Sequence, residues 1–201
     1  MASYAVIRPS QLNGLYKDPM MSLMAANPPS PTWQDGGLLA FTSGLLVSAQ
    51  NAAAVNTVIG VAASAGVLNA TTAGGNPIGL ESQSAVGAGS AIVGVRRTFY
   101  AISPLNSFTG SIDTSGSQGA TALSVTDIGT AFKLQSVNAA GALTNNAFWI
   151  LDRTGGGNLT AVVTRLIDPP GAKFGDTPVP GVNSGQALVE FTIVGRIVSL
   201  I

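Results

Sequence analysis

The stretch Val189-Glu190-Phe191-Thr192-Ile193 sets the expectation for the whole fold. Its apolar side chains fall on every second residue, with a carboxylate and a hydroxyl side chain between them. Successive side chains of an extended strand point to opposite faces, so this alternation predicts a strand with one buried and one solvated face. The stretch lies within an apolar segment, residues 187–201, that we predict to be a strand of a β-rich fold.

Further segments rich in β-branched and aromatic residues predict the other strands. Turn-forming runs such as Gly155-Gly156-Gly157 and Pro169-Pro170-Gly171 separate them. No long segment carries a helical apolar stripe, and the Ala-rich residues 51–58 predict at most one short helix. We therefore predict a mainly β protein with β-sandwich or barrel-like lobes and an extended N-terminal arm. The expected strands lie in residues 38–47 (a hairpin), 57–67, 91–102, 123–137, 147–152 and 159–167.

The distribution of proline and glycine predicts the domain organisation. Prolines recur too often in residues 1–35 for a long helix or a central strand, which favours an extended arm. Residues 36–120 are predicted to form a β-rich lobe with glycine-rich loops, and residues 121–201 a second β-rich lobe. No repeat relates the two, so two separate lobes and one continuous sandwich both remain open.

Composition excludes most kinds of catalytic and nucleic-acid-binding site. The chain has no histidine and no cysteine, which removes imidazole catalysis, thiolate chemistry and thiolate zinc sites. Nine Lys and Arg are balanced by nine Asp and Glu, so there is no basic footprint for nucleic acid. We predict that the protein is not an enzyme, binds no cofactor or metal, and has no nucleic-acid partner.

Hydropathy does not predict a membrane span. The chain carries no charged residue between Asp35 and Glu81, but Ser, Thr, Asn, Gln and Gly interrupt this segment throughout. A spanning helix needs about 20 predominantly apolar residues in a row. The first residues lack the basic and apolar parts of a secretory signal. We expect a chain made in the cytoplasm with no membrane partner.

Two acidic patterns are interpreted as structural. Asp113-Thr114-Ser115-Gly116 is similar to the catalytic loop of aspartic proteases, which needs a second equivalent loop. The only other Asp-Thr pair, Asp176-Thr177, is followed by proline, so we interpret the first pattern as a polar turn. Carboxylates spaced too far apart for a calcium loop are interpreted as solvated strand ends: Asp127, Asp152, Asp168 and Asp176.

Three groups of residues are candidates for contacts between subunits. Charged residues make up 9% of the chain, against roughly 25–35% on the surface of a typical soluble domain, which suggests that other subunits cover part of the surface. The cluster Met20, Met21, Leu23 and Met24 is either a helical turn packed on the chain's own core or an anchor for a neighbour. Arg96 and Arg97 form either a surface pair or an intersubunit ion pair with Glu190 or Asp152. Leu200 and Ile201 are expected to pack within the fold or against a partner.

Several runs resemble the capsid decoration, or cement, proteins of tailed bacteriophages. In the first half these are Asp35-Gly36-Gly37-Leu38-Leu39, Val58-Ile59-Gly60-Val61-Ala62 and Phe99-Tyr100-Ala101-Ile102. In the second half they are Ile128-Gly129, Phe132-Lys133-Leu134, Trp149-Ile150-Leu151-Asp152, Val162-Val163 to Asp168, and Val189-Glu190-Phe191. The resemblance covers residues 35–201. It implies a β-rich, often trimeric protein on the outer capsid surface that bridges neighbouring major capsid subunits, and it implies no catalytic residue.

The leading expectation is thus a structural virion protein whose partners are its own copies, as a homotrimer, and the major capsid protein. A phage tail-tube or fibre-associated protein is the nearest alternative. A carbohydrate- or surface-binding β module is another, with Trp33, Tyr100 and Trp149 as stacking platforms. A hydrolase that uses carboxylates alone is the last.

Overall fold

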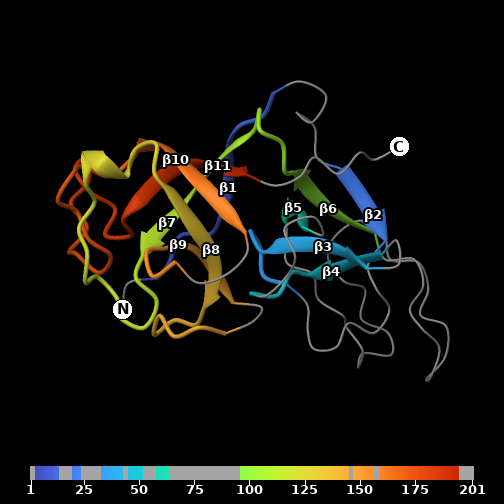
Figure 1. Cartoon of the computed structure of the whole chain (residues 1–201), viewed down its shortest axis with the longest axis horizontal. Helices are drawn as coiled ribbons and strands as arrows, with labels where there is room; N and C mark the ends of the chain where they lie inside the picture. Colours follow the sequence, from blue (N-terminus) through green and yellow to red (C-terminus); the bar gives the residue numbers. More distant parts are fainter. Residues whose placement is uncertain are drawn as a thin grey trace.

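The described residues form two β-sheets that lie side by side (Figure 1). The computed structural model describes residues 3–13, 20–23, 33–42, 45–51, 58–63, 96–144, 147–155 and 159–194. These contain a single 3-10 turn, η3 (Val125–Asp127), and eleven strands, which confirms the mainly β prediction. The strands are β1 (Arg8–Gln11), β2 (Met20–Leu23), β3 (Leu38–Thr42), β4 (Leu45–Ser48), β5 (Val58–Ala62), β6 (Arg96–Ala101), β7 (Ser107–Asp113), β8 (Ala131–Val137), β9 (Phe148–Asp152), β10 (Thr160–Leu166) and β11 (Leu188–Val194).

The larger sheet closes into a small barrel. Its strand order is β1-β7-β11-β10-β8-β9, and β9 returns to pair with β7. Five strands, β7 to β11, therefore form a ring. Because this number is odd, the neighbouring strands of the ring cannot all be antiparallel. The parallel pair is β7 with β9, joined through the register Ile112↔Leu151 and Asp113↔Asp152. The short strand β1 is added beside the barrel, antiparallel to β7.

The smaller sheet is antiparallel throughout, with the order β2-β6-β5-β3-β4. Its β3 and β4 form the predicted hairpin. Consecutive residues of β3 and β5 enter different cores: Leu38 and Val58 pack into the larger core, which the barrel shares, whereas Leu39 and Ile59 pack into a smaller one. The remaining members of the smaller core are Trp33, Leu46, Ala62 and Phe99. The shared larger core shows that the two sheets pack as one unit.

The division between the sheets differs from the predicted domain boundaries. Strands of the smaller sheet end at Ala101 and the barrel begins at Ser107, whereas the predicted boundary lay at residue 120. Residues 1–35 are not a simple arm, because they contribute β1 to the larger sheet and β2 to the smaller sheet. Tyr4 and Ile7, just before β1, are buried in the larger core. Most of the predicted helix, residues 52–57, lies outside the described residues.

Strand β7 was not predicted, although it pairs with β1, β9 and β11. Its sequence, rich in Ser, Thr and Gly, resembles a loop. The small residues make room for neighbours: a Cβ added at Gly110 would lie 3.2 Å from Cε1 of Phe191 and 3.3 Å from Cγ1 of Ile7. Gly60 of β5 is more tightly enclosed, since a Cβ there would lie 2.4 Å from Cδ2 of Phe99.

Candidate interaction surface

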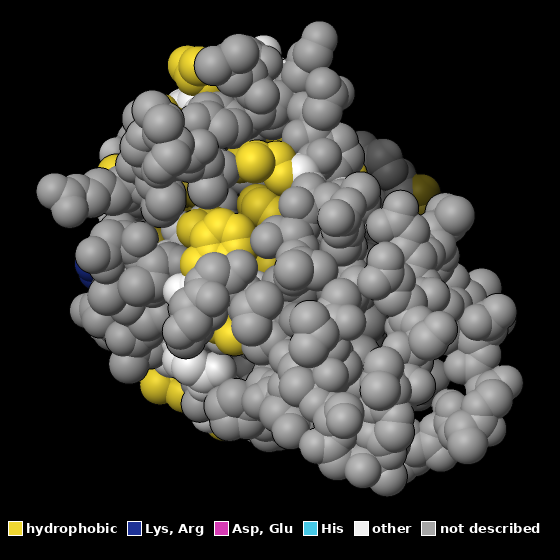
Figure 2. Space-filling model, turned by 90° about the vertical axis from the view of Figure 1, so that its right-hand side faces the viewer, with side chains coloured by type: hydrophobic (Ala, Val, Ile, Leu, Met, Phe, Trp, Pro, Cys, Tyr) yellow, Lys and Arg dark blue, Asp and Glu magenta, His cyan; other side chains and the backbone are white. Residues whose placement is uncertain are grey.

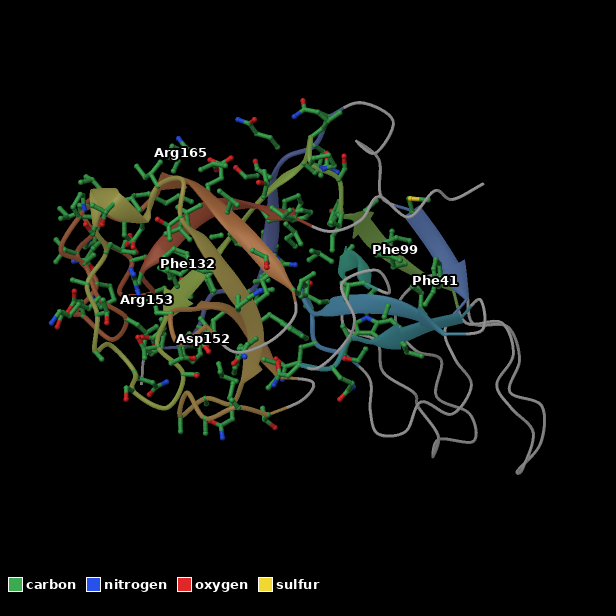
Figure 3. All side chains as sticks on the ribbon, viewed as in Figure 1. Phe41, Phe99, Phe132, Asp152, Arg153 and Arg165 are labelled. Atoms are coloured by element: carbon green, nitrogen blue, oxygen red, sulfur yellow. The ribbon has the colours of Figure 1, made fainter. Side chains whose placement is uncertain are left out.

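The structure brings two of the predicted interface groups together. Met20, Met21 and Leu23 lie in β2, an edge strand of the smaller sheet, so the interpretation of this cluster as a helical turn was wrong. Strand β2 pairs with β6, and Leu23 lies opposite Arg96. Met20 and Phe41 pack against the smaller core. The rings of Phe41 and Phe99 meet edge to face, with 6.4 Å between their centres (Figure 3). Arg97 is the next residue of β6 and lies opposite Ser22; Met24, Leu200 and Ile201 lie outside the described residues.

Most carboxylates of the described chain are turned inward. Asp113, Asp127, Asp152, Asp168 and Glu190 each have an exposed fraction of 5% or less, so the interpretation of Asp127, Asp152 and Asp168 as solvated strand ends was wrong. Burying a charge is unfavourable unless hydrogen bonds or an opposite charge compensate for it. Every one of the five has such partners, and they come from within the chain.

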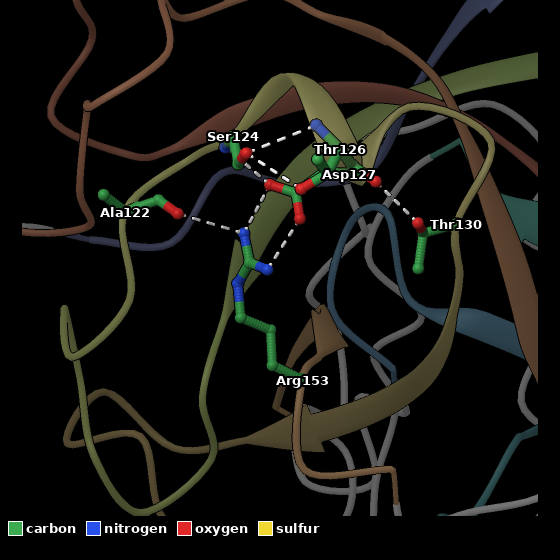
Figure 4. Close-up of polar contacts among 6 residues, drawn as sticks. All are labelled: Ala122, Ser124, Thr126, Asp127, Thr130 and Arg153. Carbon is green, nitrogen blue, oxygen red and sulfur yellow. Dashed lines mark hydrogen bonds and ion pairs between the residues drawn. The ribbon is translucent and has the colours of Figure 1, made fainter.

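Asp127 and Arg153 form a buried ion pair beneath η3 (Figure 4). The guanidinium donates to both carboxylate oxygens, at 2.8 and 2.6 Å, and the backbone N–H of Ser124 adds a third hydrogen bond at 2.8 Å. The guanidinium carbon also lies 5.3 Å from the ring centre of Phe132. Burial raises the pKa of Asp127, but these hydrogen bonds outweigh burial and hold it below its usual value. The pair fixes the turn rather than opening a reactive site.

Asp113 and Asp152 lie opposite each other where β7 and β9 close the barrel. The backbone N–H of Ser115 donates to Asp152 across this junction at 2.9 Å, and Thr154 adds hydrogen bonds from its backbone and hydroxyl. Burial raises the pKa of Asp152, but the hydrogen bonds outweigh it, and the pKa lies below normal. Asp113 accepts from the Tyr4 hydroxyl at 2.9 Å, and burial raises the pKa of that hydroxyl.

These two aspartates do not form an open catalytic pair. Each is followed by a turn with a glycine at positive φ, Gly116 and Gly155, so the two loops are locally similar. Both carboxylates are only 1% exposed. The amide of Gly119 donates to the remaining oxygen of Asp113. The arrangement braces the parallel closure of the barrel and leaves no access for a substrate.

Glu190 lies at the floor of a groove of about 420 Å³ on the outside of the barrel. It accepts hydrogen bonds from the hydroxyls of Ser10 and Ser107, at 2.9 and 2.6 Å, and pairs with Arg165 on the neighbouring strand. Burial raises the pKa of Glu190, but these partners hold it below its usual value. Glu190 and Asp152 are therefore both buried and engaged within the chain, which removes the partners suggested for Arg96 and Arg97.

Sequence reasoning missed these carboxylates as organising residues, although one signal was present. Asp113 and Asp152 each precede a Ser or Thr by two residues, and an Asp side chain often accepts a hydrogen bond from the backbone two residues on. Thr154 N–H donates to Asp152 in this way, at 3.0 Å. The contacts from distant residues carried no local signal.

The surface that remains is poor in charge. Within the described ranges, Asp35 and Asp176 are the acidic residues that are not buried, and the basic residues Arg8, Arg165 and Lys173 are exposed. Asp35 pairs with Arg8. Figure 2 shows the end of the molecule that β2, β3 and β4 form, and the described side chains visible there are mainly hydrophobic. Large apolar side chains are exposed elsewhere: Leu105, Val125, Ile128, Leu143, Ile167, Val179, Val182 and Val194.

Comparisons with protein-family models, with curated proteins and with solved structures find no match to this chain. In the part of the chain that the structure describes, no three acidic side chains gather as a metal site would require. The described residues also include no helix long and apolar enough to cross a membrane.

Proposed function

We propose that this chain is a structural protein of a tailed-bacteriophage virion, which binds the outer capsid surface and stabilises contacts between neighbouring major capsid subunits. The observation that carries the proposal is the inward placement of the carboxylates. Asp113, Asp127, Asp152, Asp168 and Glu190 are all buried, so the described surface is less charged than the composition already indicates. The sequence runs that resemble decoration proteins support the same function.

A surface with few charges is suited to a permanent contact between proteins. Each charge that enters an interface must lose its water, and this opposes association unless a partner compensates for it. Arg8, Arg153 and Arg165 are already paired within the chain. Such a surface can be covered by other copies and by the shell with few charges left uncompensated. We propose a homotrimer as the bound form.

Mass action explains how binding would stabilise a capsid. A ligand that binds the assembled shell but not its separated subunits adds RT ln(1 + [L]/Kd) per site, about 2.7 kcal/mol at a hundredfold excess over Kd. The contribution is repeated at every site of the particle. With few charges at the surface, the contact is expected to be apolar and main-chain in character, and therefore to persist at high salt.

The test is the thermal stability of shells with and without the protein. DNA-filled heads of the same phage are stripped of this protein and then decorated again with the full chain. Stripped and decorated heads are heated at low salt and at molar salt while DNA release is followed. We expect release at a higher temperature for decorated shells at both salt concentrations. Equal release temperatures would refute the role, and protection that disappears in salt would refute the apolar contact.

Two measurements accompany this test. Sedimentation at micromolar concentration should show a trimer, and a stable folded monomer would contradict the oligomeric part of the proposal. Labelled antibody against the chain should mark heads in electron micrographs of intact virions. Label confined to tails would instead support the tail-tube or fibre-associated alternative.

A further inference from the structure

The groove above Glu190, on the outer face of the barrel, has the dimensions of a small-molecule site. Its volume is about 420 Å³, and such sites usually measure roughly 300–1,000 Å³. Strands β1, β7, β10 and β11 and the connection before β7 line it. We call it the Glu190 groove; its lining includes Gln11, Leu105, Thr164, Arg165, Glu190 and Thr192.

Two β-bulges flank the Glu190 groove and turn extra side chains toward it. Ser10 has no residue opposite it in the β1–β7 pair, and Thr164 has none in the β10–β11 pair. Consecutive residues of a regular strand point to opposite faces, but here both members of each pair are exposed: Ser10 with Gln11, and Thr164 with Arg165. Bulges re-aim side chains and are over-represented next to active sites. Their position on both sides of one carboxylate therefore points to a ligand site.

The floor of the groove is held in place from within the chain. Glu190 is 5% exposed and accepts hydrogen bonds from the hydroxyls of Ser10 and Ser107 and from Nε of Arg165, at 2.9, 2.6 and 2.9 Å. The carboxylate thereby fixes the guanidinium on the outside of the barrel, where 65% of the Arg165 side chain stays exposed (Figure 3). Polar groups that are already positioned lose little conformational entropy when a ligand binds.

The walls of the groove present hydrogen-bonding groups that the chain does not use. Within the described residues, Nη1 of Arg165 and the side chains of Gln11, Thr164 and Thr192 have no hydrogen-bond partner. The guanidinium donates, whereas the amide and the two hydroxyls both donate and accept. Beside them Leu105, which is 61% exposed, adds an apolar surface. The groove therefore combines donors, acceptors and a small apolar patch.

The charges of the groove favour an uncharged ligand. Arg165 and Glu190 are the charged residues among the described lining, and they form an ion pair with 2.8 Å between Nη2 and Oε2. An anion at Arg165 would be repelled by Glu190, and a cation at Glu190 would be repelled by Arg165. An extended peptide is also a poor match, because it binds by adding to a free strand edge. Strands β7, β10 and β11 beneath the groove are paired along both edges.

We propose that the Glu190 groove binds a neutral saccharide. Sugar hydroxyls both donate and accept, as the polar wall residues require, and the C–H groups of a sugar ring can cover Leu105. The tryptophans expected as stacking platforms, Trp33 and Trp149, are 2% and 4% exposed and cannot stack on a ligand. The inference does not rest on the proposed function, since the groove belongs to the barrel itself.

The test is a titration of the full chain with uncharged sugars, followed by saturation-transfer difference NMR. Glucose, galactose, rhamnose and N-acetylglucosamine are the sugar probes. Inorganic phosphate and a capped alanine tripeptide are the anionic and peptide probes. We expect at least one of the sugars to bind, and to bind more tightly than phosphate or the tripeptide.

Variants locate the bound sugar. Arg165→Ala removes a charged donor and should weaken binding about 10-fold or more, whereas Gln11→Ala removes a neutral group and should weaken it about 2- to 10-fold. Arg8→Ala is the matched control, because Arg8 is also an exposed arginine paired with a carboxylate, that of Asp35, but does not line the groove. It should bind the sugar like wild type. Circular dichroism checks that each variant keeps the β fold.

Three outcomes would overturn the inference. If none of the sugars binds to the wild-type chain, the groove is not a saccharide site. If a sugar binds but Arg165→Ala and Gln11→Ala bind it as well as Arg8→Ala does, the sugar lies elsewhere on the protein. Tighter binding of phosphate or of the tripeptide than of any sugar would assign the groove to an anion or to a peptide instead.

Discussion

Removing the carboxylate of Asp168 should destabilise the protein much more than removing a neighbouring one. Asp168 is 4% exposed and accepts three hydrogen bonds, two from backbone amides. The variant Asp168→Ala leaves these donors without acceptors, at about 1–3 kcal/mol for each one that stays buried. Because the connection between β10 and β11 can relax and admit water, we expect the total loss of stability to lie near the lower end, about 3 kcal/mol for the three donors.

Two related variants fix the interpretation. Asp168→Asn keeps one accepting oxygen and should lose about 1–2 kcal/mol. Asp176→Ala is the matched control, because Asp176 is only half-buried and accepts one hydrogen bond, from the amide of Lys173; its loss should be below about 1 kcal/mol.

Thermal unfolding followed by circular dichroism provides the measurement. For a chain of this size, 1 kcal/mol corresponds to roughly 2–4 °C in Tm, so Asp168→Ala should melt about 6–12 °C below wild type. Denaturant titration gives the free energy of unfolding independently. If Asp168→Ala has the same Tm as Asp176→Ala, the hydrogen bonds to Asp168 do not hold the connection between β10 and β11, residues 167–187, in its conformation.

Three further predictions follow from the packing and the charges. Gly60→Ala should destabilise the smaller sheet by more than about 2 kcal/mol, since the new Cβ overlaps a buried ring; stability equal to wild type would show that β5 has room to shift. Arg165→Ala should change stability by less than about 1 kcal/mol, because that side chain is 65% exposed, whereas Glu190→Ala should cost about 2 kcal/mol by leaving the buried hydroxyl of Ser107 without its acceptor; equal losses in denaturant titrations would contradict this. Finally, the carboxyls with lowered pKa stabilise the fold above the unfolded pKa of about 4, and this stability is lost as pH falls through their folded values. Tm should therefore be flat near neutral pH and fall below about pH 4, and a fall already complete at pH 5 would be inconsistent with the lowered pKa of Asp127, Asp152 and Glu190.

Strands whose large apolar residues alternate were predictable from the sequence, and β11 is the clearest. Val189, Phe191 and Ile193 are buried as the alternation indicated. Strand β7 could not be recognised in this way, because its residues do not follow a hydropathy pattern. Gly110 leaves room for the side chains packed against it, and Ser111 supplies a hydrogen-bond acceptor. Ser111 is fully buried and accepts a hydrogen bond from the amide of Ala5 at 2.9 Å.

The buried carboxylates illustrate a second limit of sequence reasoning. Hydropathy assigns Asp and Glu to the surface, and that assignment is correct only when no donors converge on them. The donors here come from far along the chain: Tyr4 reaches Asp113 across 109 positions, and Ser10 reaches Glu190 across 180. Only a fold that is already known can show that such residues meet.

The addition of β1 to the barrel has a consequence for how the chain acquires its structure during synthesis. Ser10 leaves the ribosome long before Glu190, its hydrogen-bond partner 180 positions later. At roughly 5–20 residues per second, the interval is about 10–40 s. Strand β7, with which β1 pairs, follows it by about 100 positions, and the apolar residues that precede β1 have no finished core until β11 has also been made. The larger sheet is therefore completed late, when β11 pairs with β7 and Glu190 meets Ser10, and contacts so distant in sequence are expected to make folding slow.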